Sequence, residues 1–528
     1  MRILFVAERG ALLRFALLIP ALAERGHDVH IAFASGNDWR RWRADETILP
    51  PRRAVDLVAE LVDRYPGVTS GLAPKRVEPD GLRDVAWVVR AIADLAHNAQ
   101  PRYAGAEVLR KRTRKRALAP MRDGGGIAFR LGRRLAGPTD ARRAALGRRL
   151  ASSLERAIPT SPAIDRYLRE LVPDAVVVTG TFRHVSAEVE LVKSARRLGI
   201  PSGVFVASWD NLTNKGALKI VPEQLFVWNE NQVRDAVDLH GMPEERIVVT
   251  GAHVFDEWFE RRPTRSREAL LAEAGLDTEQ PYLAYLCSSR NIVGTDEVDF
   301  VRRWIAALRA SDDEQLRTIG VVVRLHPNAS APWAGVEFGL ENAAVWPAHG
   351  VHPVASQARA DFFDTLAQAA AVVGINTTAM IEAAILGKSV LTVLVPGFAQ
   401  ETTLHFHDLL AEKGGFLHVA PDLDTHVKQL APVLDEDVAG AERRTRFVEA
   451  FVRPRGIDRP AAPAAAEAVE ALAGVPVDPP PRAGIIPRAV VAVAARRAAR
   501  RSTPAASPPR FSADSSTDTR NVTPTATS

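Results

Sequence analysis

The sequence predicts an α/β protein built from two Rossmann-like, doubly wound domains. Three observations support this fold class. Apolar runs of strand length alternate with helical patterns, the alternation begins again near Pro281, and 528 residues are too many for a single core. We therefore expect two similar domains of unequal size, joined near residues 251–264.

The first half of the chain begins with a strand, a helix and a second strand. Arg14 to Arg25 has the apolar period of a helix, and Gly26 ends it. After a basic and mostly helical insertion at about residues 85–160, the alternation resumes. The predicted strands are Arg2–Ala7, Asp28–Ala34, Ala175–Thr179, Gly203–Ala207, Gln224–Trp228 and Ile247–Thr250.

The second half repeats this alternation and ends in a helix and a tail. Its predicted strands are Tyr282–Cys287, Gly320–Leu325, Ala370–Val373 and Ser389–Val393. We expect domains at 1–255 and 256–455, a C-terminal helix crossing at 456–474, and a disordered tail at 475–528. The tail is rich in Pro, Ser, Thr and Ala, which cannot bury a core. Within it, Ile485–Arg501 is compatible with a basic amphipathic helix, either solvated or lying on a membrane.

The composition restricts location and chemistry. Cys287 is the only cysteine, so neither an intramolecular disulfide nor a cysteine-based zinc cluster is possible. The first eight residues do not resemble a signal peptide, and no uninterrupted run of 18 or more apolar residues occurs. We expect a cytoplasmic enzyme, with peripheral contact at the inner face of the membrane as a further possibility.

The segment from Arg110 to Arg149 is strongly basic. It holds fourteen Arg or Lys residues and only two acids, Asp123 and Asp140. A solvated helical face is one interpretation. A surface for anionic lipid head groups or for a pyrophosphate-linked acceptor is the other. Nucleic-acid binding is disfavoured, because Tyr103 and Phe129 are the only aromatic residues in or near this segment that could stack on bases.

Polar residues gather at the predicted strand ends, where open α/β sheets bind ligands. In the first half these residues are Glu8, His184 and the loop Ser208–Gly216 with Asp210; in the second half they are Ser288, Ser289, Arg324, His326 and the turn Asn376–Thr378. Each also has a structural interpretation, such as a surface ion pair, a helix cap or an Asx turn. Arg324 and His326 lie on one strand face and together can hold a phosphate.

The turn Asn376-Thr-Thr378 stands where an apolar strand gives way to a helix that Gly387 ends. Unpaired N–H groups and the helix dipole make such a start an anion site. Glu382 lies four residues after Thr378, whereas a capping box needs three. A phosphate at the turn with a carboxylate one turn on suits a nucleotide diphosphate. An ordinary capped helix with a solvated Glu is the alternative.

Other chemistries find little support. No nucleophile elbow, dinucleotide fingerprint or P-loop motif occurs. The acidic clusters 422–424 and 435–437 lie in late loop or cap contexts, and His405 and His407 are typical of a loop near the site rather than of a ligand pair. We expect no cofactor and no metal.

The two α/β halves, the strand end Arg324-Leu-His-Pro327, the turn and helix from Gly374 to Glu382, and the final helix together resemble GT-B-type glycosyltransferases over about residues 1–474. Within this class the chain is similar to bacterial surface-polysaccharide transferases and, more distantly, to CDP-glycerol glycerophosphotransferases. The resemblance implies two domains facing a cleft. A nucleotide-diphosphate sugar donor would lie on the second domain, and a glycan or lipid-linked acceptor on the first.

The resemblance also implies residue roles. Thr377 and Thr378 hold the donor diphosphate, Glu382 accepts from the ribose, Ser288 and Ser289 form a phosphate-binding turn, and His326 takes part in catalysis. The histidine that many relatives carry in the first loop is missing here, so the base is Glu8, His184 or Asp210. Sugar transfer without a metal is the expected function. A CDP-glycerol-type transferase, a non-hydrolysing nucleotide-sugar epimerase and a non-catalytic membrane-surface scaffold stay open as alternatives.

Overall fold

The computed structural model describes most of the chain. The described residues are 1–8, 11–34, 52–78, 80–124, 126–180, 182, 186–294, 297–326, 331–333, 335–336, 338–347, 356–435 and 437–502.

The first sheet has seven strands in the order β3-β2-β1-β4-β5-β6-β7, and every neighbouring pair is parallel. Its strands are β1 (Arg2–Glu8), β2 (Asp28–Ala34), β3 (Val68–Leu72), β4 (Ala175–Val178), β5 (Ser202–Phe205), β6 (Gln224–Val227) and β7 (Ile247–Val249). The central strands are apolar throughout because cores cover both faces of the sheet.

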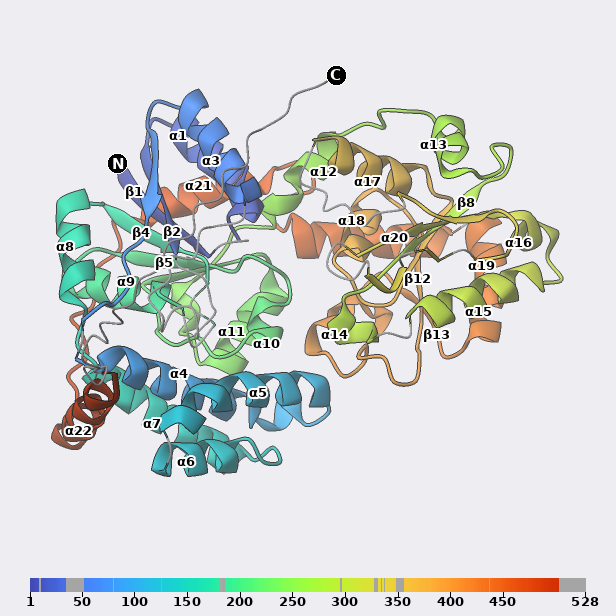
Figure 1. Cartoon of the computed structure of the whole chain (residues 1–528). Helices are drawn as coiled ribbons and strands as arrows, with labels where there is room; N and C mark the ends of the chain where they lie inside the picture. Colours follow the sequence, from blue (N-terminus) through green and yellow to red (C-terminus); the bar gives the residue numbers. More distant parts are fainter. Residues whose placement is uncertain are drawn as a thin grey trace, which may run out of the picture.

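The second sheet has six strands, again all parallel, in the order β10-β9-β8-β11-β12-β13. Its strands are β8 (Tyr282–Leu286), β9 (Gly320–Arg324), β10 (Ala343–Val345), β11 (Ala371–Gly374), β12 (Val390–Val393) and β13 (His418–Ala420). The two sheets with their covering helices form the two halves visible in Figure 1. The predicted fold class, two parallel-sheet α/β domains, is therefore confirmed.

Helices cover both sheets. Those around the first sheet are α1 (Leu18–Glu24), α3 (Arg52–Arg64), α8 (Pro162–Leu171), α9 (Glu188–Arg197), α10 (Asn211–Asn214) and α11 (Glu230–His240). Those of the second half are α12 (Asp256–Glu260), α13 (Arg267–Ala274), α14 (Arg290–Val293), α15 (Glu297–Arg309), α16 (Glu314–Thr318), α17 (Ser356–Gln368), α18 (Ala379–Ile385), α19 (Leu423–Asp435) and α20 (Val438–Phe447).

After the second sheet the chain returns to the first through α21 (Ala461–Leu472). Asp256 holds the start of this helix, since its carboxylate accepts from the N–H groups of Ala461 at 2.9 Å and Ala462 at 2.7 Å. The same carboxylate pairs with Arg453 at 3.0 Å. Further along, α21 packs into the core of the first sheet and lies beside α1 (Figure 1). This return ties the two halves together.

A helical insertion lies beside the first sheet. It contains α4 (Leu82–Asn98), α5 (Glu107–Gly124), α6 (Ile127–Leu135) and α7 (Ala141–Ala157). Helix α22 (Ile485–Ser502) packs against α4 and α7 through Val491 and Ala495. This part of the tail is therefore helical, at the residues 485–501 whose sequence is compatible with a helix, and it is docked on the insertion rather than solvated or disordered. A few regularly spaced apolar residues sufficed for docking, because the insertion offers an apolar face. In the part of the chain that the structure describes, no helix is long and apolar enough to cross a membrane.

Candidate functional site

Loops from the carboxyl ends of the two sheets meet at Trp209 and Thr378. The indole Nε1 of Trp209, which follows β5, donates to Thr378 Oγ1 at 3.1 Å; Thr378 follows β11. The Trp209 ring also packs edge-on against His405 of the second half, with ring centroids 4.7 Å apart. Because strand ends are where parallel α/β sheets bind ligands, this junction is the candidate site.

The turn after β11 is held by buried hydrogen bonds. Asn376 N–H donates to Ser288 Oγ at 3.1 Å, and Asn376 Nδ2 donates to Thr403 Oγ1 at 2.9 Å. Ser288 is fully buried, and its own N–H donates to Glu297 Oε1 at 2.8 Å. Ser288 and Asn376 thus hold the buried side of the turn in place, while Thr377 and Thr378 remain partly exposed.

Thr378 is the N-cap residue of α18, but its side chain makes no capping hydrogen bond. Its backbone is already helical, with φ −56° and ψ −30°, and its hydroxyl accepts from Trp209 instead. The prediction that Thr378 and Glu382 form no capping box is confirmed.

Glu382 is partly buried, one turn into α18. Burial raises the pKa of its carboxyl to about 7, Glu257 adds to the rise, and Arg14 opposes it. Arg14 belongs to the 3-10 turn Leu12–Phe15 after β1, so this charge effect on Glu382 comes from the other half of the molecule. A carboxyl with a pKa near neutrality changes charge readily when a ligand changes its surroundings.

Asp210 stands immediately before α10 and is well held. Asn214 Nδ2 donates to its Oδ2 at 2.9 Å. Burial opposes ionisation, but the charge of Lys215, followed by His405 and the bond from Asn214, holds the pKa of Asp210 well below its ordinary range. The carboxylate is therefore ionised at neutral pH and is a poor proton acceptor.

His405 faces Asp210 from the 3-10 segment Leu404–Leu409. Its Nδ1 lies 3.4 Å from Thr213 Oγ1. Burial lowers the pKa of His405 to about 4, although Asp210 opposes the shift. The ring is therefore neutral at pH 7. The sequence predicted only a loop near the site here.

Arg324 and His326 lie at the end of β9. The Arg324 guanidinium is buried between the rings of Trp346 and Phe362, 5.4 Å from each centroid, and donates to Trp346 O at 3.3 Å. Burial lowers its pKa to about 10, so it keeps its charge. His326 is partly buried. Among the described contacts none joins Arg324 to the turn at Asn376.

Ser289, Glu8 and His184 are the other predicted site residues. Ser289 is the partly buried N-cap residue of α14 and makes no side-chain cap bond. The backbone of Glu8 ends β1 opposite Ala34, and its side chain lies outside the described residues. His184 also lies outside them.

The structure thus brings together Asp210, Asn376, Thr377, Thr378 and Glu382, with Ser288 behind them. Sequence reasoning missed Arg14, because nothing in its spacing shows that it faces a helix some 370 residues later. In the described ranges, no group of three or more His, Cys, Asp or Glu side chains is placed to hold a metal ion. Metal independence stays a prediction.

The chain is similar in fold to two classes of solved structure, nucleotide-sugar epimerases and glycosyltransferases. UDP-GlcNAc 2-epimerase from Neisseria meningitidis bound to UDP-GlcNAc is 12% identical with a TM-score of 0.47, covering 89% of this chain and 99% of that one. WaaG, a glycosyltransferase involved in lipopolysaccharide biosynthesis, is 14% identical with a TM-score of 0.43, covering 90% and 100%. The spinosyn rhamnosyltransferase SpnG complexed with thymidine diphosphate is 14% identical with a TM-score of 0.42, covering 89% and 100%.

Likeness at this level concerns the fold alone. No protein-family model and no curated protein matches the chain.

Proposed function

We propose that the chain is a metal-independent glycosyltransferase that moves a sugar from a nucleotide-diphosphate donor to a glycan or lipid-linked acceptor. The meeting of Trp209 with Thr378 carries the proposal, because it joins polar loops from the carboxyl ends of both sheets. Residues 256–455 would hold the donor and residues 1–255 the acceptor.

On the donor side, the diphosphate lies against the turn at Thr377 and Thr378. Arg14, close enough to affect the pKa of Glu382, supplies positive charge from the opposite half. One of its donors already holds Ala207 O at 3.2 Å, which orients the guanidinium. Arg324 is less suited to this task because two aromatic rings enclose it. Glu382 accepts a hydrogen bond from a ribose hydroxyl.

On the acceptor side, the proton must pass to a base with a higher pKa than Asp210 has. Asp210 is better suited to positioning the loop 208–216 through Asn214 and Lys215. Of the three predicted bases, Glu8 and His184 therefore remain. Glu8 ends β1, and in the sheet β1 neighbours β4, which neighbours β5. Glu8 therefore lies at the same carboxyl end of the sheet as the loop after β5 that contains Trp209.

In the proposed reaction the acceptor hydroxyl attacks the anomeric carbon, and its proton passes to that base. The bond from the anomeric carbon to the diphosphate oxygen breaks, and the nucleoside diphosphate leaves with the electron pair. Arg14 and the Thr hydroxyls stabilise the charge that develops on the leaving oxygen.

The proposed location is the cytoplasm, with the basic insertion touching anionic membrane lipids where the acceptor is lipid-linked. Charge complementarity supports this, since exposed arginines of the insertion project into solvent and each basic residue near an anionic surface adds about 1 kcal/mol.

A thermal-shift screen against UDP, GDP, CDP and dTDP tests the proposal. One of these ligands at 100 times its Kd is expected to stabilise the protein by about 2.7 kcal/mol. The Thr378→Val variant, which keeps the side-chain volume, is expected to lose most of that shift. Absence of any shift contradicts the proposal. Conversion of a donor without acceptor, followed by chromatography, would identify an epimerase instead.

A further inference from the structure

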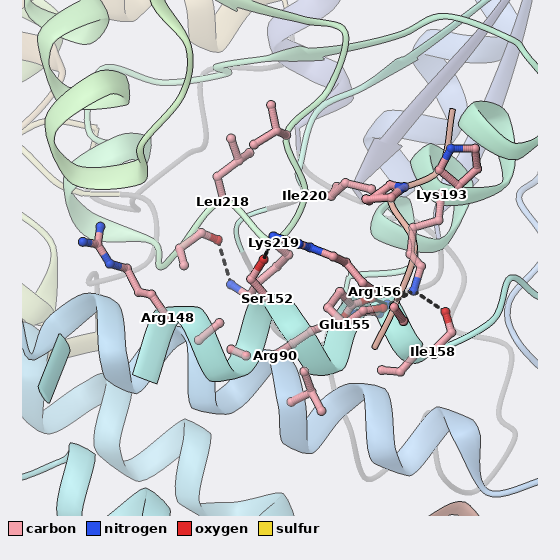
Figure 2. Close-up of a pocket in the computed structure, with 18 of the residues that line it drawn as sticks. Arg90, Arg148, Ser152, Glu155, Arg156, Ile158, Lys193, Leu218, Lys219 and Ile220 are labelled. Atoms are coloured by element: carbon pink, nitrogen blue, oxygen red, sulfur yellow. Dashed lines mark hydrogen bonds and ion pairs between the residues drawn. The ribbon is translucent and has the colours of Figure 1, made fainter. Parts of the chain in front are cut away.

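A pocket of about 960 Å³ lies in the first half of the molecule, away from the junction of Trp209 and Thr378. The insertion helices α4 and α7 form one wall, and α9 with the loop 217–221 forms another. Residues 480–483 and, from the first turn of α22, Arg488 also line the pocket. Figure 2 shows this pocket.

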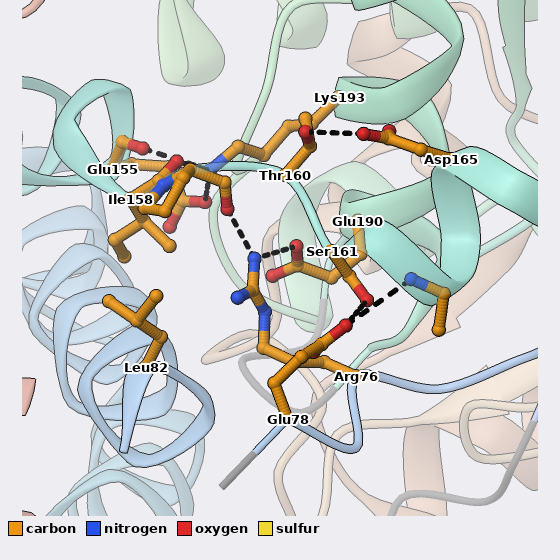
Figure 3. A network of polar contacts seen from close by, with 12 residues as sticks. Arg76, Glu78, Leu82, Glu155, Ile158, Thr160, Ser161, Asp165, Glu190 and Lys193 are labelled. Atoms are coloured by element: carbon orange, nitrogen blue, oxygen red, sulfur yellow. Dashed lines mark hydrogen bonds and ion pairs between the residues drawn. The ribbon is translucent and has the colours of Figure 1, made fainter. Parts of the chain in front are cut away.

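An ion-pair network forms the interior of the pocket. Arg90 donates to both carboxylate oxygens of Glu155, at 3.0 and 2.8 Å. Lys193 donates to Glu155 Oε1 at 2.9 Å and to Ile158 O at 2.9 Å. Behind it, Arg76 pairs with Glu190 at 3.1 Å (Figure 3). Buried charges of this kind are stable only with their partners, so these groups build the wall and leave little charge for a ligand.

Of the other basic side chains that line the pocket, Arg196, Arg197 and Lys219 pair with Glu223, Asp165 and Asp94, whereas four arginines are not balanced in this way. Arg148, Arg156, Arg482 and Arg488 line it, and none has a carboxylate within ion-pair distance in the described part of the chain. Among the described residues, the hydrogen bond that Arg156 donates is to Ser152 Oγ, at 3.0 Å. Figure 2 shows Arg148 extending away from the group around Glu155. The residues that line the pocket therefore carry an excess of positive charge.

These four arginines come from three segments of the chain rather than from one helix face, and Arg156, Arg482 and Arg488 are exposed. Two lie on α7, one on the extended chain and one on α22, and they converge on one cavity. Apolar side chains such as Val89, Leu218 and Ile220 line the space between them. Guanidinium groups bind phosphate with paired hydrogen bonds, and apolar walls suit an organic portion.

We propose that this pocket is a second ligand site, which binds a molecule carrying a pyrophosphate or another multiply charged phosphate group on an organic portion. The segment 480–488 completes the site, so docking of α22 and ligand binding support each other. This site is separate from the proposed donor site and does not depend on the proposed function.

Calorimetric titration with inorganic pyrophosphate tests this proposal on the full chain. The test variant is Arg156→Glu with Arg488→Glu, and the control is Arg149→Glu with Arg497→Glu. The control changes the same charge on the same two helices at exposed positions that do not line the pocket. We expect binding to weaken at least about tenfold in the test variant and less than about twofold in the control. Unfolding midpoints of both variants verify that they fold.

Several outcomes overturn the proposal. Equal weakening in both variants would show general surface electrostatics, and absence of pyrophosphate binding would remove the site. Binding to phosphatidylglycerol vesicles without binding to pyrophosphate would assign the arginines to a membrane surface. Pyrophosphate can also bind at the proposed donor site. Such binding should be equal in both variants, and it is fitted as a separate set of sites.

Discussion

The raised pKa of Glu382 predicts that donor affinity depends on pH. If the ionised carboxylate accepts from the ribose, the ligand binds only the ionised form, and binding releases a proton. Since the pKa is about 7 in the free protein, about one carboxyl in eleven is ionised at pH 6 and ten in eleven at pH 8. The apparent Kd should therefore fall about tenfold, or about 1.4 kcal/mol, from pH 6 to pH 8.

The assay is calorimetric titration with the donor identified by the nucleotide screen. A nucleotide-diphosphate sugar is preferable to the free diphosphate, because its doubly esterified phosphates do not titrate in this range. The matched variant is Glu382→Gln, which keeps size and shape and removes the charge. Its affinity should be weaker than that of the wild type at pH 8 and constant from pH 6 to 8. A flat wild-type profile, or an equal slope in the variant, would refute the role of Glu382.

Arg14, Glu382, Trp209 and the independence from metal can each be tested separately. Arg14→Ala removes the group that lowers the pKa of Glu382, so the midpoint of the affinity profile should move to higher pH. An unchanged midpoint would show that Arg14 does not affect the pKa of Glu382. The pKa of Glu382 is about 7 in the folded state and 4.5 in the unfolded state, so the folded state holds the proton more tightly. The free energy of unfolding of the wild type should therefore fall, relative to that of Glu382→Gln, as pH rises from about 4.5 through 7. Denaturant unfolding should show a loss of up to about 3 kcal/mol. Trp209→Phe removes the bond to Thr378 and should cost about 1 kcal/mol of donor binding, whereas the control Trp258→Phe should leave binding unchanged. Turnover should persist in EDTA, and loss restored by Mn²⁺ would contradict the metal-independent mechanism.

Much of the fold follows from the sequence because the strands are buried on both faces. Runs such as Ile3–Ala7 and Ala371–Gly374 are apolar without alternation, and a parallel sheet between helix layers requires that pattern. The turn at Asn376 was predictable for a related reason: its polar residues interrupt an apolar strand just before a helix.

The sequence could not show the features that depend on contacts between distant segments. The hydroxyl of Ser288, a predicted phosphate ligand, accepts from the N–H of Asn376, 88 residues later, and the sequence does not reveal this bond. Arg324 looks like a second phosphate ligand, but Trp346 and Phe362 enclose it. Helix α22 docks because α4 and α7 offer an apolar face, which the composition of the tail does not reveal.

Hydrogen–deuterium exchange with saturating donor nucleotide tests the central claim, that the ligand lies between the two sheets, most directly. We expect added protection in two segments at once, 375–386 of the second half and 208–216 of the first, and loss of both effects in Thr378→Val. Protection confined to one half of the molecule, or to the pocket at α7 and α22, would contradict it.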